Sequence, residues 1–250
     1  MKKTLSFIFI LLLALYFNGC RTFSPYPQVR EFYKEMALEE NSSIYFENLQ
    51  GDLDIIGWKK NQIEIRAAKS GADSLLRQTD IEIKKEGKNL YIKTHLPRGD
   101  LSRFFVDFEL RVPEKVLFKE IKINTGNLNS MQIYGELKAS IETGNIEIED
   151  FSGLCEVFAD EGYIAARIFE NKKDDVLSFK TSDGDIKLYL PSVPNVQITA
   201  ETRVGNISSD FIPEEEQKED LKTWEQTLGE GAAKIIIKTW SGKILIKKTQ

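Results

Sequence analysis

Five glycines spaced nine residues apart are the feature that most limits how this chain can fold. They are Gly126, Gly135, Gly144, Gly153 and Gly162. Alternate members lie in similar phrases, Thr125-Gly126-Asn127-Leu128 and Thr143-Gly144-Asn145-Ile146. Self-similarity at a fixed spacing is typical of repeat proteins, in which each unit packs mainly against its neighbours.

Looser copies of the phrase extend the repeat in both directions. The turn glycines of the seven copies are Gly51, Gly126, Gly144, Gly162, Gly184, Gly205 and Gly242. From Gly126 to Gly205 successive copies lie 18 to 22 residues apart, whereas Gly205 and Gly242 are 37 apart, which indicates an insertion.

The position two residues after each of these glycines is apolar in every copy. Its occupants are Leu53, Leu128, Ile146, Ile164, Ile186, Ile207 and Ile244. Apolar residues also alternate before the glycine, and such alternation predicts strands with one buried face. Glycine supplies the positive φ or tight turn between two strands, so each repeat is expected to be strand, turn, strand.

A unit this short cannot bury its apolar face alone, so successive units are expected to stack about 4.8 Å apart. The predicted fold is all-β: a single-stranded β-solenoid or β-helix-like stack of coils of 18–22 residues. A meander or sandwich of antiparallel hairpins is the alternative that nine-residue spacing also allows. The identical register of every copy favours the solenoid.

The repeat-built β domain is expected to span residues 36–250. Within it we expect irregular strands over 36–113, regular coils over 114–212, an insertion over 213–231 and a closing coil over 232–248. The insertion is acidic and compatible with a short helix or an irregular segment, because Leu221, Trp224 and Leu228 would share one side of a helix.

The first nineteen residues have the layout of an export signal: Lys2 and Lys3, then an apolar stretch from Leu5 to Phe17. That stretch is shorter than the roughly 20 residues of a membrane-spanning helix. Gly19-Cys20 resembles the end of bacterial lipoprotein signals. The resemblance implies a signal peptide over 1–19, lipidation of Cys20, a tether over 20–35 and attachment to a membrane of the cell envelope.

Arg21 after the cysteine is compatible with the outer membrane. The formal net charge is −5, and removal of Lys2 and Lys3 lowers it to −7. Because nucleic-acid binding draws most of its affinity from clustered basic residues, we expect no nucleic-acid partner. With Cys20 lipidated, only Cys155 remains, which excludes an internal disulfide and a multi-cysteine metal site.

No catalytic residues and no cofactor are expected. His95, the only histidine, lies at an expected strand end, and Cys155 occupies an apolar column of the repeat. The position after the turn glycine carries side-chain oxygens that could ligate calcium. These weak metal candidates are Asp52, Asn127, Asn145, Asp185 and Asn206. Asn and Asp are also the ordinary partners of glycine in tight turns and form ladders without metal, so we assign no metal.

The Ser/Thr-Gly-Asp/Asn-Ile/Leu phrases resemble those of a bacterial family known as putative adhesins, a domain of unknown function. The strand Val106–Val112 before Pro113 and the segment Gly231–Gly242 resemble that family too, and the match covers about 36–248. The resemblance implies a β-solenoid-like domain at the cell envelope. Four aromatic residues could form a protein- or glycan-binding surface, namely Tyr134, Tyr163, Trp224 and Trp240.

The leading hypothesis is therefore a lipid-anchored envelope protein, not an enzyme, that presents a rigid β-solenoid surface for binding or scaffolding, like an adhesin. Two alternatives remain open at this point. One is an envelope enzyme that acts on glycan from a β-helix scaffold. The other is a structural, self-assembling element of the envelope.

Overall fold

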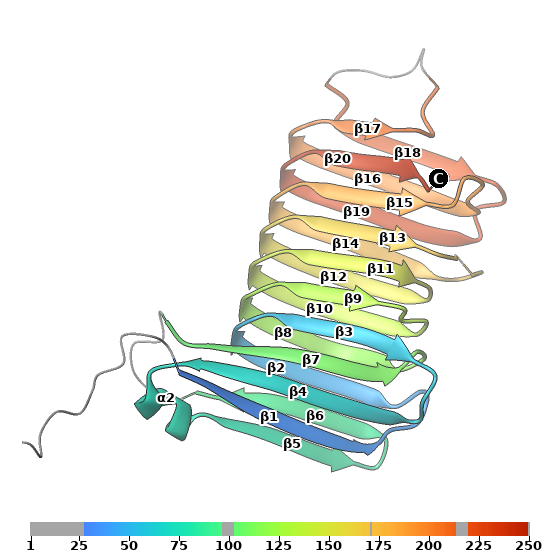
Figure 1. Cartoon of the computed structure of the whole chain (residues 1–250). Coiled ribbons are helices and arrows are strands. Elements are labelled where there is room, and N and C mark those ends of the chain that lie inside the picture. The colour runs from blue at the N-terminus through green and yellow to red at the C-terminus, as the bar shows by residue number, and fades with distance from the viewer. Residues whose placement is uncertain (1–27, 97–102, 171, 214–219, 250) are drawn as a thin grey trace, which may run out of the picture.

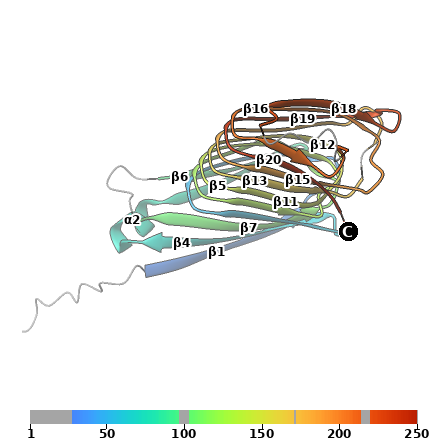
Figure 2. The ribbon, with the colours of Figure 1, turned by 90° about the horizontal axis from the view of Figure 1, so that it is seen from above.

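Two ten-stranded sheets lie face to face in the computed structural model, which describes residues 28–96, 103–170, 172–213 and 220–249 (Figures 1 and 2). Sheet A contains, in spatial order, β1 (Gln28–Ala37), β4 (Gln62–Gly71), β7 (Phe105–Pro113), β3 (Leu53–Trp58), β9 (Leu128–Met131), β11 (Ile146–Phe151), β13 (Ile164–Ile168), β15 (Ile186–Leu190), β20 (Ile244–Lys248) and β17 (Ile207–Ser209). Sheet B contains β18 (Thr223–Leu228), β16 (Val196–Val204), β19 (Ala233–Ser241), β14 (Val176–Asp183), β12 (Leu154–Glu161), β10 (Glu136–Thr143), β8 (Leu117–Thr125), β2 (Ser43–Gln50), β6 (Asn89–His95) and β5 (Asp80–Glu86).

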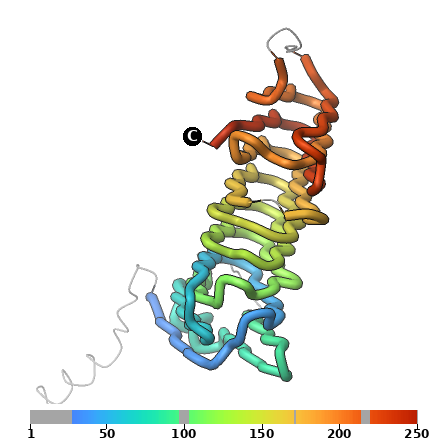
Figure 3. The backbone as a smooth tube through the Cα atoms, turned by 90° about the vertical axis from the view of Figure 1, so that its right-hand side faces the viewer, coloured from blue at the N-terminus to red at the C-terminus, as the bar shows by residue number. Residues whose placement is uncertain are grey.

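Each glycine phrase joins a strand of sheet B to a strand of sheet A and so makes one coil. The coils are β2–β3, β8–β9, β10–β11, β12–β13, β14–β15, β16–β17 and β19–β20. Neighbouring coils pair in parallel and in register, so that Ile146 lies between Leu128 and Ile164. The all-β, solenoid-like fold is therefore confirmed, and parallel pairing excludes the antiparallel-hairpin alternative for the repeats (Figure 3).

The order of the coils in space differs from their order along the chain. The last coil, β19–β20, lies between β14–β15 and β16–β17, and it pairs in parallel with both (Figure 1). The C-terminal segment is thus inserted into the stack rather than added at its end.

Antiparallel strands flank the parallel stack at both ends. At one end β4 pairs with β7, β1 pairs with β4, and β5 pairs with β6. At the other end β18 pairs with β16, and the Lys222 ammonium donates to the carbonyl of Gly205, the turn glycine of the last coil in space. These additions cover strand edges that would otherwise present unpaired backbone groups.

Within the described part of the 213–231 insertion, Thr223–Leu228 form strand β18, where we expected a short helix or an irregular segment. Trp224 and Leu228 are four residues apart, a spacing that places two side chains on one side of a helix and equally on one side of a strand. In β18 both are partly buried and pack against the core, while the intervening residues are exposed. The segment forms a strand because its backbone pairs with that of β16.

The chain before Gln28, with the expected signal peptide, Cys20 and the first part of the tether, lies outside the described residues. The strand β1 begins at Gln28, so residues 28–35 are paired with β4 although we expected them to belong to the tether. One short helix that the repeat pattern did not indicate, α2 (Asp73–Gln78), follows β4. None of the described residues forms a helix with the length and hydropathy that a bilayer crossing requires.

Apolar columns from the two sheets fill the space between them. The column two residues after the turn glycine is buried in every coil, with Leu53, Leu128, Ile146 and Ile164 fully inaccessible. Burying a side chain of this size contributes about 1.5–3 kcal/mol, and members in the middle of the stack, such as Ile146, lie between equivalent residues of two neighbouring coils. The core is therefore continuous along the whole stack.

We expect Ile146→Lys to unfold the domain or to lower its melting temperature by more than 10 °C, because it buries an unpaired charge at the centre of the column. Ser140→Lys, on the exposed face of β10, is the matched control and should melt within a few degrees of the wild type. Thermal unfolding followed by circular dichroism checks both. Equal melting of the two variants would contradict the register described above.

Candidate functional site

The turn glycines form a column at one corner of the stack in which the backbones of successive coils approach closely. All seven have positive φ, from +127° at Gly51 to +158° at Gly184. A Cβ added to Gly144 would lie 1.9 Å from the carbonyl oxygen of Gly126, and the same contact recurs along the column. Only glycine fits such a position, so these residues have a structural role.

The Asn and Asp side chains that follow the glycines act on the backbone of the next coil. The Asp52 Oδ1 accepts hydrogen bonds from the backbone N–H of Asn127 at 2.8 Å and from its side-chain amide at 3.1 Å. Asn127 Oδ1 accepts the N–H of Asn145, and Asn145 Oδ1 accepts the N–H of Tyr163, both at 3.0 Å. Asp185 Oδ1 accepts the N–H of Lys243 at 2.7 Å.

These hydrogen bonds explain the Asn/Asp row as a ladder that satisfies backbone donors at the glycine corner. Asn206 occupies the same turn position in the last coil in space. Asp107 joins the row from β7, where its carboxylate accepts the N–H of Asp52 at 2.9 Å. Across the described ranges, no three His, Cys, Asp or Glu side chains group as metal ligands. Turn chemistry therefore accounts for this row.

His95 and Cys155 lie in separate environments, and neither environment resembles a nucleophile–base pair. His95 Nε2 lies 2.7 Å from the carboxylate of Glu82, and both side chains are about half exposed. Cys155 is fully buried in the apolar column of β12, and burial raises the pKa of its thiol far above the ordinary range. A thiol of this kind is inert because the reactive species is the thiolate.

The four aromatic residues singled out from the sequence do not form one surface. Tyr163 and Trp240 are exposed, and Trp240 stacks under the guanidinium of Arg203 at 4.1 Å. Trp224 packs on the core, and Tyr134 contacts Phe169. Among the described residues, no ring contact joins two of the four.

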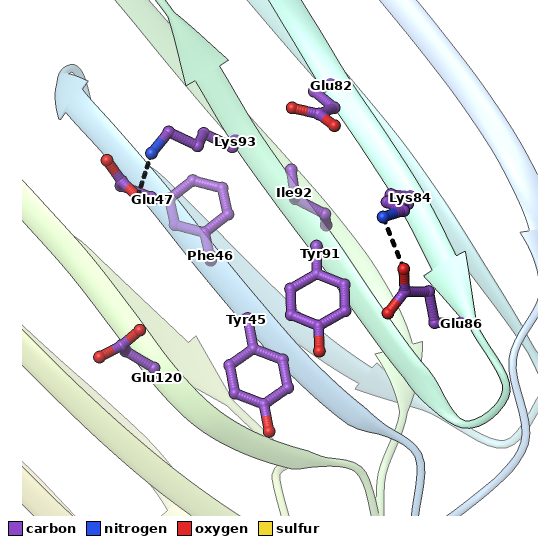
Figure 4. A pocket seen from close by; sticks show the side chains of 10 residues that line it. All are labelled: Tyr45, Phe46, Glu47, Glu82, Lys84, Glu86, Tyr91, Ile92, Lys93 and Glu120. Carbon is purple, nitrogen blue, oxygen red and sulfur yellow. Dashed lines mark hydrogen bonds and ion pairs between the residues drawn. The ribbon is translucent and has the colours of Figure 1, made fainter.

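Two other tyrosines do come together on the outer face of sheet B. Tyr45 of β2 and Tyr91 of β6 are register partners, and their rings are nearly parallel, with centroids 4.8 Å apart (Figure 4). The separation matches the spacing of neighbouring strands, so strand pairing itself aligns the rings. Each tyrosine lies between two buried residues and therefore points away from the core.

Charged side chains surround this tyrosine pair. Lys93 contacts Glu47 at 2.8 Å, and Lys84 contacts Glu86 at 2.5 Å, on two sides of the rings (Figure 4). Glu120 lies beside Tyr45 in the register of β8. Together they line a shallow hollow of ≈ 330 Å³, which we call the tyrosine hollow.

The tyrosine hollow has the ingredients of a recognition site for a partly polar ligand. Aromatic rings offer a rigid apolar surface with a polar hydroxyl, and the surrounding carboxylates and ammonium groups offer hydrogen-bond acceptors and donors. The sequence did not point to this pair, because the two tyrosines are separated by 45 residues. A usable signal was present, since Ile44-Tyr45-Phe46 and Leu90-Tyr91-Ile92 share the pattern of a tyrosine between two apolar residues.

The parallel stack, the glycine column and the ladder at its corner define a repeat-built, solenoid-like β protein. The chain belongs to the Toastrack DUF4097 family, whose model matches residues 38–247. The resemblance expected over 36–248 is thus confirmed. No curated protein matches the chain.

Two solved structures from bacteria resemble this chain. A "putative cell adhesion protein" from Clostridium sporogenes superposes with a TM-score of 0.56 at 15% identity, covering 89% of this chain and all of that one. A "putative lipid binding protein" from Parabacteroides distasonis has a TM-score of 0.41 at 12% identity, covering 88% of this chain and 97% of that one. The first likeness supports the fold, and the second is too low to carry an argument.

We expect Gly144→Ala to destabilise the domain by about 2–4 kcal/mol, because the new methyl group meets the backbone of the neighbouring coil and φ is +146°. Gly87→Asn is the matched control, since Gly87 has φ +60° with nothing within 4 Å of an added Cβ and asparagine tolerates this conformation. Urea unfolding measures both. If Gly144→Ala were as stable as the control, the close backbone approach at the glycine column would not be required for stability.

Proposed function

We propose that the protein is a lipid-anchored, non-enzymatic protein of the bacterial cell envelope that binds a glycan through the tyrosine hollow, in the manner of an adhesin. The alignment of Tyr45 and Tyr91 inside a ring of charged groups carries this proposal. The C–H face of a sugar packs on aromatic rings, and its hydroxyls can both donate to Glu47 and accept from Lys93. The likeness of the fold to the Clostridium sporogenes protein supports an adhesive role.

Binding is better supported than glycan hydrolysis. A glycosidase needs a carboxylic acid that stays protonated near neutral pH, which requires a raised pKa. In the tyrosine hollow, the hydrogen bond with His95 lowers the pKa of Glu82 instead. Glu47 and Glu86 each form an ion pair with a lysine of the hollow.

The lipid anchor fits the position of β1 in the fold. Cys20 precedes Gln28 by eight residues, a length that spans at most about 29 Å when fully extended. Since β1 is the outermost strand of sheet A, a lipidated Cys20 would hold that end of the stack near the membrane. The glycine-phrase coils would then project away from it, and the tyrosine hollow would lie in the membrane-proximal part.

The anchor predicts incorporation of labelled palmitate into the wild-type protein expressed in a bacterial host. Cys20→Ala should abolish the label and release the protein from the membrane fraction, because stable attachment needs two or more acyl chains. Cys155→Ala is the matched control and should be labelled like the wild type. Label that persists in Cys20→Ala would refute the anchor.

If the tyrosine hollow binds glycan, the protein should bind one or more glycans on a microarray. Peptidoglycan sacculi serve as a second probe. Replacing both Tyr45 and Tyr91 by alanine should weaken the interaction about 10-fold or more, as truncation of central aromatic anchors does. Tyr163→Ala, which removes an exposed tyrosine elsewhere, should bind normally. Unchanged binding by a folded double variant would exclude the hollow as the site.

A further inference from the structure

A second hollow, on the outer face of sheet A, has a strongly basic lining in an otherwise acidic protein. It has a volume of ≈ 490 Å³ and lies over β13, β15 and β20, towards the opposite end of the stack from the tyrosine hollow. Its side chains with functional groups include Arg167, Lys187, Tyr189, Asp210, Lys247 and Lys248. Four cations and one acid line this basic hollow, whereas the whole chain has a net charge of −5.

Strand register builds the basic hollow in the same way as it aligns the tyrosines. Arg167 pairs with Tyr189, and Tyr189 pairs with Lys247, so these three side chains follow one another across neighbouring strands. The guanidinium of Arg167 lies 5.4 Å from the centre of the Tyr189 ring, and the ammonium of Lys187 lies 5.1 Å from it. Both cations therefore lie within cation–π distance of the same ring.

Acidic residues neutralise only part of this charge. Arg167 contacts Glu149 at 3.2 Å, and Lys247 contacts Asp210 at 2.8 Å. Hydrogen bonds from Lys247 and from the backbone N–H of Lys248 lower the pKa of Asp210, which keeps it charged. Within the described ranges, no ion pair involves Lys187 or Lys248. The ammonium of Lys248 lies 5.2 Å from the centre of the Phe211 ring, and that of Lys187 lies near the Tyr189 ring, so neither charge is paired directly with a carboxylate of the described residues.

We propose that the basic hollow binds a phosphate monoester group. A dianion with three terminal oxygens can accept hydrogen bonds from Lys187, from Lys248 and from the fork of Arg167 together, whereas a neutral sugar gains nothing from these charges. The hollow is a single site of limited size, without the extended basic stripe of a nucleic-acid surface. Its ligand is therefore a phosphorylated small molecule, a phosphorylated glycan or a phosphate headgroup.

Glucose 6-phosphate is the first probe, titrated into the ¹⁵N-labelled mature domain at low salt with glucose as the uncharged control. We expect saturable shifts for residues around Lys187 with glucose 6-phosphate alone, and weaker binding as sodium chloride is raised. Arg167→Gln combined with Lys187→Gln should reduce the affinity about 10-fold or more. Lys59→Gln combined with Lys180→Gln makes the same change of net charge elsewhere and should bind like the wild type.

Vesicles of phosphatidylcholine with and without phosphatidic acid distinguish the sources of the phosphate. Binding only to the acid-containing vesicles, lost in the Arg167→Gln, Lys187→Gln variant, would identify a headgroup as the source and support the site. Failure of both glucose 6-phosphate and these vesicles to bind at millimolar phosphate would overturn the proposal, as would equal loss in the two double variants. Tyr45→Ala with Tyr91→Ala leaves this site intact, so the glycan proposal is tested separately.

Discussion

The close approach of backbones at the glycine corner is the constraint on which the rest of the structure depends. A carbonyl oxygen of each coil occupies the space where a side chain of the next coil would begin. Any other residue would push neighbouring coils apart and lengthen the parallel hydrogen bonds of both sheets. Because every coil turns at an equivalent glycine, the apolar residues two positions later fall into one column, which packs against the apolar columns of sheet B in the core.

A tight corner leaves peptide groups that the sheets do not pair, and short polar side chains satisfy them. In the earlier coils an Asn or Asp accepts the N–H after the next glycine. In the later coils a threonine three residues before the glycine donates to a glycine carbonyl of the neighbouring coil, as Thr181 does to Gly162 and Thr239 to Gly184. These hydrogen bonds are exposed or partly buried, so each contributes about 0.5–1.5 kcal/mol and helps to hold successive coils in register.

The repeat could be predicted from the sequence because the glycine spacing, the apolar alternation and the turn residues all indicate the same conformation. The conformation of β18 could not, since the spacing of Trp224 and Leu228 fits a helix as well as a strand. The sequence offered a shared pattern around Tyr45 and Tyr91, but it did not show which strands are neighbours, and both hollows depend on that. Tyr45 and Tyr91, and likewise Arg167 and Lys247, belong to different strands, and only the pairing of those strands brings them together.

The insertion of the last coil between two earlier ones was equally hidden, because one glycine phrase looks much like another. The inserted coil also affects the order in which the chain can fold during synthesis. When β16–β17 leaves the ribosome, the coil on which it finally packs does not yet exist, because β19–β20 has not been synthesised. An early coil can pack on the preceding coil as soon as it has been made. In contrast, β16–β17 must wait until β19–β20 has been made. The part of the stack farthest from β1 therefore assembles in one late step, during which its apolar faces are exposed to solvent.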